Sequence, residues 1–306
     1  MRLSVIVCTY NRAYAILDCL RSIEQSISFA APIDAEVIVI DNASTDETSA
    51  VVSEWAKTCS VPVNLQLEPR KGLSAARNCG IRIAKGELLI FTDDDCRMAQ
   101  DYIKDALRHD ANDGEELVLR GGRVELGDPT DLPLTTKTDL TTSRWNRSLH
   151  SAKYENLGNC LLGCNMTMRK KLTQLLGEFD SNLGAGTSIA GGEDTDYIFR
   201  AYLGNISIEY VPDMAVTHYH GRKERKHGYK LFENYCIGGG ALYAKYLFKD
   251  PNLCKQVLWD GKDLIRELVY GKHPAWIETG FSYKAKMYNY IVGATKYMFA
   301  QIKIKP

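Results

Sequence analysis

The sequence predicts an α/β fold in which a mostly parallel sheet carries helices on both faces. Two observations over the first 125 residues support this prediction. Short apolar runs rich in β-branched residues indicate buried strands, and each is followed by a segment whose apolar residues recur at helical spacing. Strands that alternate with helices of this length favour parallel pairing, because the crossover helix returns the chain to the same end of the sheet.

The predicted elements follow one another in a regular order. We expect strands at "LSVIVCTY", "AEVIVIDNAS", "VNLQLEP" and "ELLIFTDDD", separated by helices over residues 11–28, from residue 45 onward and over residues 73–84. In such sheets ligands bind beyond the carboxyl ends of the strands. The polar clusters "CTYNR", "DNAS" and "TDDD", which are distant in sequence, should therefore converge on one crevice.

Beyond residue 125 the pattern loosens. Residues 127–160 are rich in Thr, Asp, Pro, Ser and Asn and indicate a long irregular segment. "GCNMTMRKK" then predicts a strand entering a helix, a glycine-rich loop leads into the helix at "GGEDTDYIFRAYLGN", and "ISIEYVPDMAVTHYH" predicts a strand pair broken at Pro212. The expected parts are residues 1–125 as an α/β part, residues 126–222 as a less regular part of the same domain, and residues 223–306 as a mainly helical extension.

Composition excludes several classes of protein. The 38 basic and 38 acidic residues balance, so nothing drives the chain as a whole toward nucleic acid. The nine cysteines lack zinc-ligand spacing, since no second pair or nearby His joins Cys160 and Cys164, and they suggest reduced thiols in the cytoplasm. The N-terminal apolar run is too short for a signal peptide, and no apolar run is long enough to span a membrane.

Three carboxylates, Asp93, Asp94 and Asp95, follow the fourth predicted strand in "FTDDDC". One Asp there is explained as a helix cap, because its oxygen accepts orphan backbone N–H groups. Three repel one another unless a divalent cation lies among them, and Mg²⁺ or Mn²⁺ takes such oxygen ligands together with substrate phosphates. On an extended chain Asp93 and Asp95 share a face. The motif therefore indicates either a capped turn or a site for a metal and a phosphate.

Other polar positions also have a structural and a functional interpretation. Asp41, which closes "VIVID", can cap a turn, the interpretation favoured for it alone, or accept hydrogen bonds from a nucleoside. Glu193 and Asp194, behind two glycines, can cap a helix or supply a general base for a hydroxyl. His218 and His220 alternate in an extended stretch and share a face, where each is a structural histidine or a metal ligand.

Taken together, seven motifs resemble the family 2 glycosyltransferases, which have the GT-A fold. They are, in order, "SVIVCTYNR", "VIVIDNASTDET", "GLSAARNCGI", "LLIFTDDDC", "GCNMTMRK", "FDSNLGAG" with "GGEDTDYIFRAYLGN", and "YVPDMAVTHYH". Each motif is weak alone, but seven in this order and spacing are specific. The resemblance covers residues 3–222 of the 306. It implies that residues 1–125 bind the nucleotide sugar and that residues 126–222 form the acceptor-binding and catalytic part of the same domain.

The resemblance implies a nucleotide-diphosphate-sugar donor, a divalent metal (Mn²⁺ or Mg²⁺) and inversion at the anomeric carbon. It implies that Asp194 is the catalytic base and that Glu193 supports it or binds the acceptor. The other implied contacts are Asp41 at the donor base, Thr9 and Arg77 beside the nucleotide, Asp93 at the ribose, Asn165 near the donor sugar, and Asp95 with His218 at the metal. His220 is the weaker candidate for the metal.

The chain departs from the family pattern at one position. Where the family often has a fourth acid after the Asp-x-Asp motif, this chain has Cys96, which we interpret as a packed thiol. Asp94 stands at a variable position of the family, so the resemblance implies no role for it. The contact expected of Asp41 suits UDP best, with dTDP and GDP as alternatives.

Two other functions are alternatives to this one. A nucleotide-sugar-binding module without catalysis would not need Asp93, Asp95, Asp194 and His218 together. A sugar-phosphate nucleotidylyltransferase usually carries a glycine-rich, Arg- or Lys-containing loop after its first strand, and "CTYNRAYAIL" has none. The resemblance therefore implies an inverting glycosyltransferase of the hexosyltransferase type, acting in polysaccharide biosynthesis on a hydroxyl of a glycan or a lipid-linked saccharide.

Three segments bear on the acceptor and on location. The basic run "RKERKHGYK" is solvated, closes over the donor diphosphate, or meets anionic lipid headgroups. The C-terminal tail mixes aromatic and apolar residues with lysines, which fits an interfacial helix and equally a helix on the core or at a dimer interface. The segment around Trp145 should stack on a sugar or fold over the site. We expect a cytoplasmic protein with peripheral contact at the inner face of the membrane.

Overall fold

A mixed sheet of nine strands forms the centre of the computed structural model, which describes residues 1–148, 157–250, 252–271 and 282–304. The strands are β1 (Leu3–Thr9), β2 (Ala35–Asp41), β3 (Val63–Leu67), β4 (Leu88–Asp93), β5 (Cys96–Met98), β6 (Val118–Leu126), β7 (Ser143–Trp145), β8 (Asn165–Arg169) and β9 (Ser207–His218). The helices are α1 (Ile16–Ala30), α2 (Thr48–Ala56), α3 (Leu73–Ile83), α4 (Tyr102–Asn112), α5 (Lys170–Leu176), α6 (Glu193–Leu203), α7 (Arg225–Tyr246), α8 (Asn252–Tyr270) and α10 (Tyr283–Ile304), with a 3₁₀ turn at Leu157–Asn159.

The sheet confirms the predicted α/β class and refines the pairing. Its spatial order is β3-β2-β1-β4-β8-β6-β9-β5, with β7 paired to β9. The first four strands in this order run parallel, as their alternation with α1, α2 and α3 predicts. The second half is mixed, because β8 runs antiparallel to β4 and β6, whereas β6 runs parallel to β9. The expectation of a mostly parallel sheet thus holds only for its N-terminal half.

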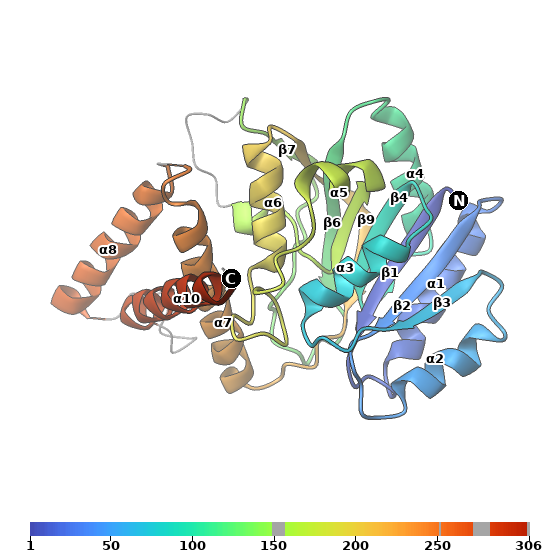
Figure 1. The fold of residues 1–306 in the computed structure, drawn as a ribbon, viewed down its shortest axis with the longest axis horizontal. Coiled ribbons are helices and arrows are strands. Elements are labelled where there is room, and N and C mark those ends of the chain that lie inside the picture. The colour runs from blue at the N-terminus through green and yellow to red at the C-terminus, as the bar shows by residue number, and fades with distance from the viewer. Residues whose placement is uncertain (149–156, 251, 272–281, 305–306) are drawn as a thin grey trace.

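Two apolar clusters cover the two faces of the sheet. On β1, Val5 and Val7 face a cluster completed by α1, α2 and α4, whereas Ile6 faces a cluster completed by α3, α5 and α6. This alternation follows from the period of two along a strand, and both faces are buried because helices cover both (Figure 1). The carboxyl ends of β1, β2 and β4 consequently lie side by side at one edge of the sheet.

Strand β9 corrects the expectation of a strand pair broken at Pro212. The chain continues as one strand through this residue. Its pairing with β6 shifts register between Gly122 and Val124, which face Val211 and Val216. A bulge of this kind accommodates Pro212, which has no N–H to give to the ladder, without ending the strand. Strand β9 therefore carries its last residue, His218, to the same sheet edge as β4.

The three C-terminal helices α7, α8 and α10 lie to one side of the sheet (Figure 1). A third apolar cluster joins α7 and α10 to the glycine-rich loop before α6, and its members are Leu183, Ile189, Ile237, Ala241 and Tyr297. Helices α7 and α10 cross closely, since a Cβ on Gly240 would lie 2.0 Å from the carbonyl oxygen of Tyr290. Within the described residues, no helix combines the length and the apolar character needed to cross a bilayer.

Candidate active site

A cavity of about 570 Å³ opens at the carboxyl ends of β1 and β4. Residues from "CTYNR", from "DNAS" (through Asn42) and from "TDDD" line it, so the predicted convergence of the three polar clusters is confirmed. The loop before β8, the start of α6, the end of β9 and the start of α7 complete the wall. The volume is within the range of small-molecule and cofactor sites.

Asp95 lies between two cationic partners in this cavity. Its Oδ1 is 3.2 Å from Nε2 of His218, and its Oδ2 is 3.0 Å from a terminal nitrogen of Arg12. Burial would raise the pKa of Asp95, but the hydrogen bond and charge of His218, aided by Arg12, lower it below its usual value. Burial would likewise lower the pKa of His218, but the bond to Asp95 raises it to about 9. Asp95 and His218 therefore form a buried ion pair.

Asp94 is held by the first strand rather than pointing away. The hydroxyl of Thr9 donates to it at 2.6 Å, and Nε of Arg12 lies 3.3 Å from its other oxygen. Burial raises the pKa of Asp94 to about 7, although Arg12 and Thr9 oppose the shift. Thr9, which was expected beside the nucleotide, lines the cavity, but its hydroxyl donates its hydrogen bond to this carboxylate. Asp94 thus fixes Arg12 and Thr9 at the rim.

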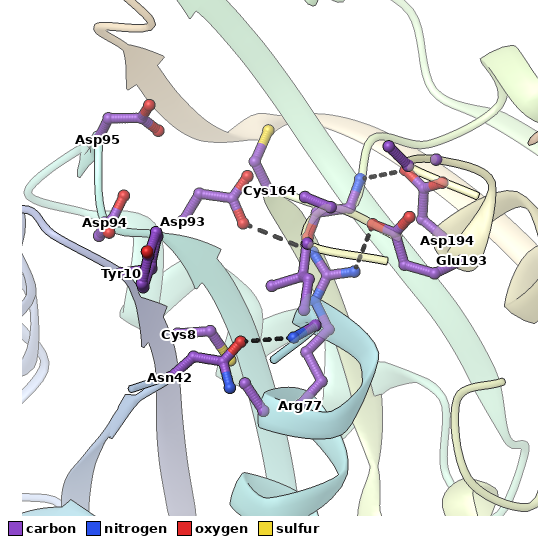
Figure 2. A pocket seen from close by; sticks show the side chains of 18 of the residues that line it. Cys8, Tyr10, Asn42, Arg77, Asp93, Asp94, Asp95, Cys164, Glu193 and Asp194 are labelled. Carbon is purple, nitrogen blue, oxygen red and sulfur yellow. Dashed lines mark hydrogen bonds and ion pairs between the residues drawn. The ribbon is translucent and has the colours of Figure 1, made fainter. Parts of the chain in front are cut away.

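Arg77 connects the two acidic motifs of the cavity (Figure 2). One terminal nitrogen lies 3.2 Å from Oε1 of Glu193, and the other donates to the carbonyl of Gly163 at 3.1 Å and lies 3.5 Å from Oδ1 of Asp93. The side chain of Arg77 is 3% exposed. Burial and the neighbouring Asp194 raise the pKa of Glu193 to about 7, while Arg77 opposes the shift. Arg77 therefore sets the position of the start of α6 relative to the end of β4.

Asp194 lies on the cavity wall in the first turn of α6. Its Oδ2 accepts a hydrogen bond from the backbone N–H of Gly163 at 3.1 Å, and its Oδ1 accepts one from the N–H of Thr195 at 2.7 Å. The preceding Gly192 has φ of 87°, a left-handed conformation that turns the chain sharply into the helix. The carboxylate of Asp194 is thus held in a fixed orientation on the cavity wall.

Asp41 does not line the cavity. Its carboxylate accepts hydrogen bonds from the backbone N–H of Ser44, at 2.8 Å, and from the hydroxyl of Ser49. These bonds match the turn-capping interpretation. The neighbouring Asn42 lines the cavity instead, and its side chain ties down the following loop by accepting from the N–H of Gly72 (Figure 2).

Asn165 also lies outside the cavity and is fully buried. Its amide nitrogen donates to the carbonyls of Arg123 and Met214, and its oxygen accepts from the hydroxyl of Tyr102 at 2.6 Å. All these groups belong to the framework of the sheet and α4. Both polar atoms of the Asn165 side chain are used inside the fold, so Asn165 does not contact a ligand in the cavity directly. The remaining predicted residues, Thr9, Arg77, Asp93, Asp95, Glu193, Asp194 and His218, all line the cavity.

The cavity contains cationic and aromatic residues that the motif analysis did not single out. Tyr10 and Lys71 lie on one wall, with the ammonium 5.2 Å from the ring centroid. Arg222 and Tyr235 lie on the side of the C-terminal helices. One terminal nitrogen of Arg222 is buried and has no hydrogen-bond partner among the described residues. The basic run that begins at Arg222 was noted in the sequence, but the sequence did not indicate which of its side chains would line the cavity.

The two histidines of "VTHYH" have different roles. His220 is buried, accepts the backbone N–H of Arg222 at Nδ1 and bonds the carbonyl of Leu132 through Nε2. Both ring nitrogens are thus used by the loop, which leaves His218 as the histidine that faces the acidic motif. Sulfur atoms of Cys96 and Cys164 and a ring nitrogen of His218 lie within 4.8 Å of one another. The fold thus brings Cys164 beside His218, 54 residues further along the chain, whereas Cys160 is not part of this group.

An open α/β sheet with a cavity at its strand ends, lined by two acidic motifs, is typical of an enzyme that acts on a small-molecule ligand. The chain belongs to the glycosyl transferase family 2, whose family model matches residues 4–176. It is therefore a glycosyltransferase, as the resemblance of its motifs predicts.

Named relatives agree with this assignment. The chain is 26% identical over 239 residues to the glycosyltransferase AglE of Haloferax volcanii, a match that covers 78% of this chain and 72% of AglE. It is 25% identical to polypeptide N-acetylgalactosaminyltransferase 6 of Bos taurus, covering 70% of this chain but only 37% of that longer relative.

Solved structures share the fold. S. aureus TarS 1-349 superposes with a TM-score of 0.61 and 18% identity, covering 96% of this chain and 81% of that one. The mannosyltransferase PcManGT from Pyrobaculum calidifontis, in complex with GDP-Man and Mn²⁺, has a TM-score of 0.59 and 21% identity, covering 98% of this chain and 88% of that one. At these identities the likeness establishes the GT-A fold.

Proposed function

We propose that this chain is an inverting glycosyltransferase that moves a sugar from a nucleotide-diphosphate donor, a UDP-sugar being favoured, to a hydroxyl of a glycan or lipid-linked saccharide. The observation that carries the proposal is the cavity in which Arg77 joins the Asp93–Asp95 end to the Asp194 end. Two neighbours of the same fold support the donor class. TarS is described with UDP and with UDP-GlcNAc, and PcManGT with GDP-Man.

A divalent metal fits the donor set at the acidic end. Asp93 and Asp95 offer hard carboxylate oxygens and His218 an imidazole nitrogen, which suit Mn²⁺ and Mg²⁺. The neighbour PcManGT is described with Mn²⁺. When bound, such a metal would neutralise negative charge that develops on the departing diphosphate.

The cationic side chains of the cavity would stabilise the same charge. Arg12 is fixed by Asp94 and Asp95 at the rim, and Arg222 has a buried nitrogen without a hydrogen-bond partner in the described residues. A diphosphate oxygen would satisfy that nitrogen. Tyr10, exposed on the cavity wall beside Lys71, offers an aromatic face for the nucleobase.

Asp194 would act as the general base. It would accept the proton of the acceptor hydroxyl as the oxygen attacks the anomeric carbon from the face opposite the diphosphate. The bond from that carbon to the diphosphate oxygen breaks, and its electron pair leaves with the diphosphate. A route through a covalent sugar–enzyme intermediate needs a second free carboxylate under the carbon. Glu193 is paired with Arg77, which supports a single displacement with inversion.

The acceptor and location are proposed from the surroundings of the cavity. The segment that carries Trp145 pairs with β9 as strand β7, while residues 149–156 of the expected acceptor loop lie outside the described residues. A lipid-linked acceptor would place the enzyme at the inner face of a membrane. The described cysteines form no disulfide among themselves, which agrees with the expected cytoplasmic location.

A donor panel tests the proposal. Release of nucleoside diphosphate from UDP-, dTDP- and GDP-sugars is measured with Mn²⁺ or chelator, and the product of the best donor is analysed for anomeric configuration. We expect one UDP-sugar to be turned over only with metal, with inversion, and not by Asp194→Asn. Release of pyrophosphate from a sugar phosphate and a nucleoside triphosphate would instead identify a nucleotidylyltransferase, and a retained configuration would refute the single displacement.

A further inference from the structure

Exposed apolar side chains are concentrated on the C-terminal helices. Of the twenty large hydrophobic residues that are exposed in the described chain, twelve lie between residues 248 and 302. They are Phe248, Leu258, Trp259, Ile265, Leu268, Val269, Tyr270, Tyr288, Ile291, Met298, Phe299 and Ile302. Single exposed apolar residues are ordinary on a protein surface, but a concentration of this kind marks an interaction surface.

On α8 the exposed apolar residues form a stripe that also carries the basic residues. Leu258, Ile265 and Val269 are seven and four residues apart and therefore share one face. Lys262 projects from the same face, and Trp259 flanks it with 71% of its surface exposed. Lys255 and Arg266 border the stripe at helical spacing and are also exposed. The face thus combines a broad apolar strip with positive charge.

The acidic residues of α8 point elsewhere. Asp260 is buried and pairs with Lys286 of α10 at 2.7 Å, and Glu267 accepts a hydrogen bond from the backbone N–H at the start of α10. Asp263 lies on the same side of the helix as these two and is half-buried. Two of the three acids of α8, Asp260 and Glu267, therefore serve its packing onto α10, whereas Asp263 lies 3.6 Å from a terminal nitrogen of Arg266. Lys255 and Lys262 remain as the basic side chains of the outer face.

Helix α10 repeats the pattern along its exposed side. Tyr288, Ile291, Met298 and Ile302 recur at three-, seven- and four-residue spacing and share one face. Residues 283–304 contain four lysines and no Asp or Glu, and Lys284 is exposed on the same face. Figure 1 shows that α8 forms the end of the molecule farthest from β3, beyond α7 and α10. We call the exposed faces of α8 and α10 the docking face.

We propose that the docking face binds the surface of a lipid bilayer that contains anionic headgroups. Its apolar strip would enter the headgroup region while its Lys and Arg side chains pair with the anionic lipids, as interfacial amphipathic helices do. Charge favours this occupant, because residues 247–306 carry ten Lys and Arg against five Asp and Glu, although the chain as a whole is neutral. The body of the protein is correspondingly negative and would be held away from the bilayer.

A second copy of the chain fits the docking face less well. A two-fold interface would place the same basic stripe of α8 against itself, or against the acid-free α10, and like charges across an interface are unfavourable. This inference deepens the proposed function, since a lipid-linked acceptor would lie in the bilayer. Binding to vesicles does not itself depend on transfer activity.

Vesicle flotation of the full chain tests the docking face. The vesicles are of phosphatidylcholine alone or mixed with phosphatidylglycerol. Two double variants remove one feature each: Leu258→Ser with Ile265→Ser, and Lys255→Glu with Lys262→Glu. Matched controls change exposed residues of the α/β part: Leu140→Ser with Leu175→Ser, and Lys104→Glu with Lys171→Glu. Unfolding midpoints of all variants establish that each is folded.

We expect binding to the anionic vesicles only, weakened about tenfold or more by each docking-face variant and unchanged in the controls. The tryptophan emission of the chain, which has four Trp, should shift to shorter wavelength on binding, and Trp259→Phe should reduce that shift. Wild-type chain that does not bind, or variants that bind normally, would overturn the proposal. So would sedimentation showing a dimer that the same variants dissociate.

Vesicle binding without any transfer activity would refute the proposed function alone, and transfer to a water-soluble acceptor without vesicle binding would refute the docking face alone.

Discussion

The cavity and the docking face depart from the ordinary distribution of side chains in opposite directions. Folding usually buries apolar groups and leaves charges in water. The cavity instead buries Arg77, Asp94 and His218, whereas the docking face leaves Trp259 and Ile265 exposed by 71% and 63%. Both departures are unusual for a folded chain, so both regions are candidates for binding sites.

The two regions differ in how the departure is compensated. In the cavity Arg77, Asp94 and His218 each have a partner of opposite charge within the chain, so their charges are compensated without a ligand. The exposed apolar strip of α8 has no comparable cover in the described chain. The cavity is therefore preorganised, which suits catalysis. The apolar side chains of the docking face, by contrast, would be removed from water only by contact with an external surface.

The largest effect should come from Asp194→Asn. The amide cannot accept a proton at catalytic pH, so transfer should fall about 1,000-fold while donor binding persists. Initial rates and calorimetric donor binding measure the two quantities separately, with Glu115→Gln as an exposed control. Full transfer activity in Asp194→Asn would show that the base lies elsewhere.

Arg77→Met should have the largest effect on stability. The variant leaves Glu193 and Asp93 without their buried partner, and breaking a buried ion pair typically costs about 3 to 5 kcal/mol. Urea unfolding at pH 7.5 gives the free energy of unfolding. A loss well below about 1 kcal/mol would indicate that water or conformational change relieves the two acids, and the cavity would then be less preorganised than we infer.

Asp94→Asn should change the pH dependence of stability. The pKa of this carboxyl is raised from 3.8 to about 7 in the fold, so the protonated form stabilises the fold at low pH and that contribution is lost as pH rises to 7. An amide retains the neutral state, and at pH 8 the variant should be more stable than wild type by on the order of 1 to 3 kcal/mol. At pH 4 the two should be similar. Thermal melts across this range, with exposed Asp101→Asn as control, decide the matter, and a variant less stable than wild type at pH 8 contradicts the assignment.

The smallest effect on stability should come from Ile265→Ser on the docking face. Its side chain is already 63% exposed, so the free energy of unfolding should change by less than about 0.5 kcal/mol. Val39→Ser in the core is the contrasting variant and should be strongly destabilising. If Ile265→Ser were comparably destabilising, the apolar strip of α8 would be buried in solution, and this result would contradict the proposed docking face.

Much of the site was predictable because strand ends are readable from sequence. Apolar runs that stop at polar clusters place "CTYNR" and "TDDD" at the same sheet edge, and the structure has them there. The helix at Glu193 and the strand that delivers His218 follow from the same periodicity and from Gly192 before the helix. These inferences need only local patterns and the rule for ligands in parallel sheets.

Features that depend on side-chain direction were not predictable. Asp41 and Asn165 occupy expected positions along the chain, yet their polar atoms are used by neighbours inside the fold. The grouping of Cys96 and Cys164 with His218 needs the antiparallel half of the sheet, which the sequence pattern did not indicate. Adjacent residues of a strand point to opposite faces of the sheet, so a one-residue error in the predicted register reverses which polar side chains face the cavity.

Calorimetric binding of UDP, dTDP, GDP and CDP, each with Mn²⁺ and with chelator, tests the central claim most directly. We expect wild type to bind UDP only with Mn²⁺, and Asp95→Asn to lose about tenfold to 100-fold in affinity, whereas Asp101→Asn binds normally. Equal binding with chelator, normal binding by Asp95→Asn, or no binding of any diphosphate would contradict the claim that "FTDDDC" holds a metal and the donor.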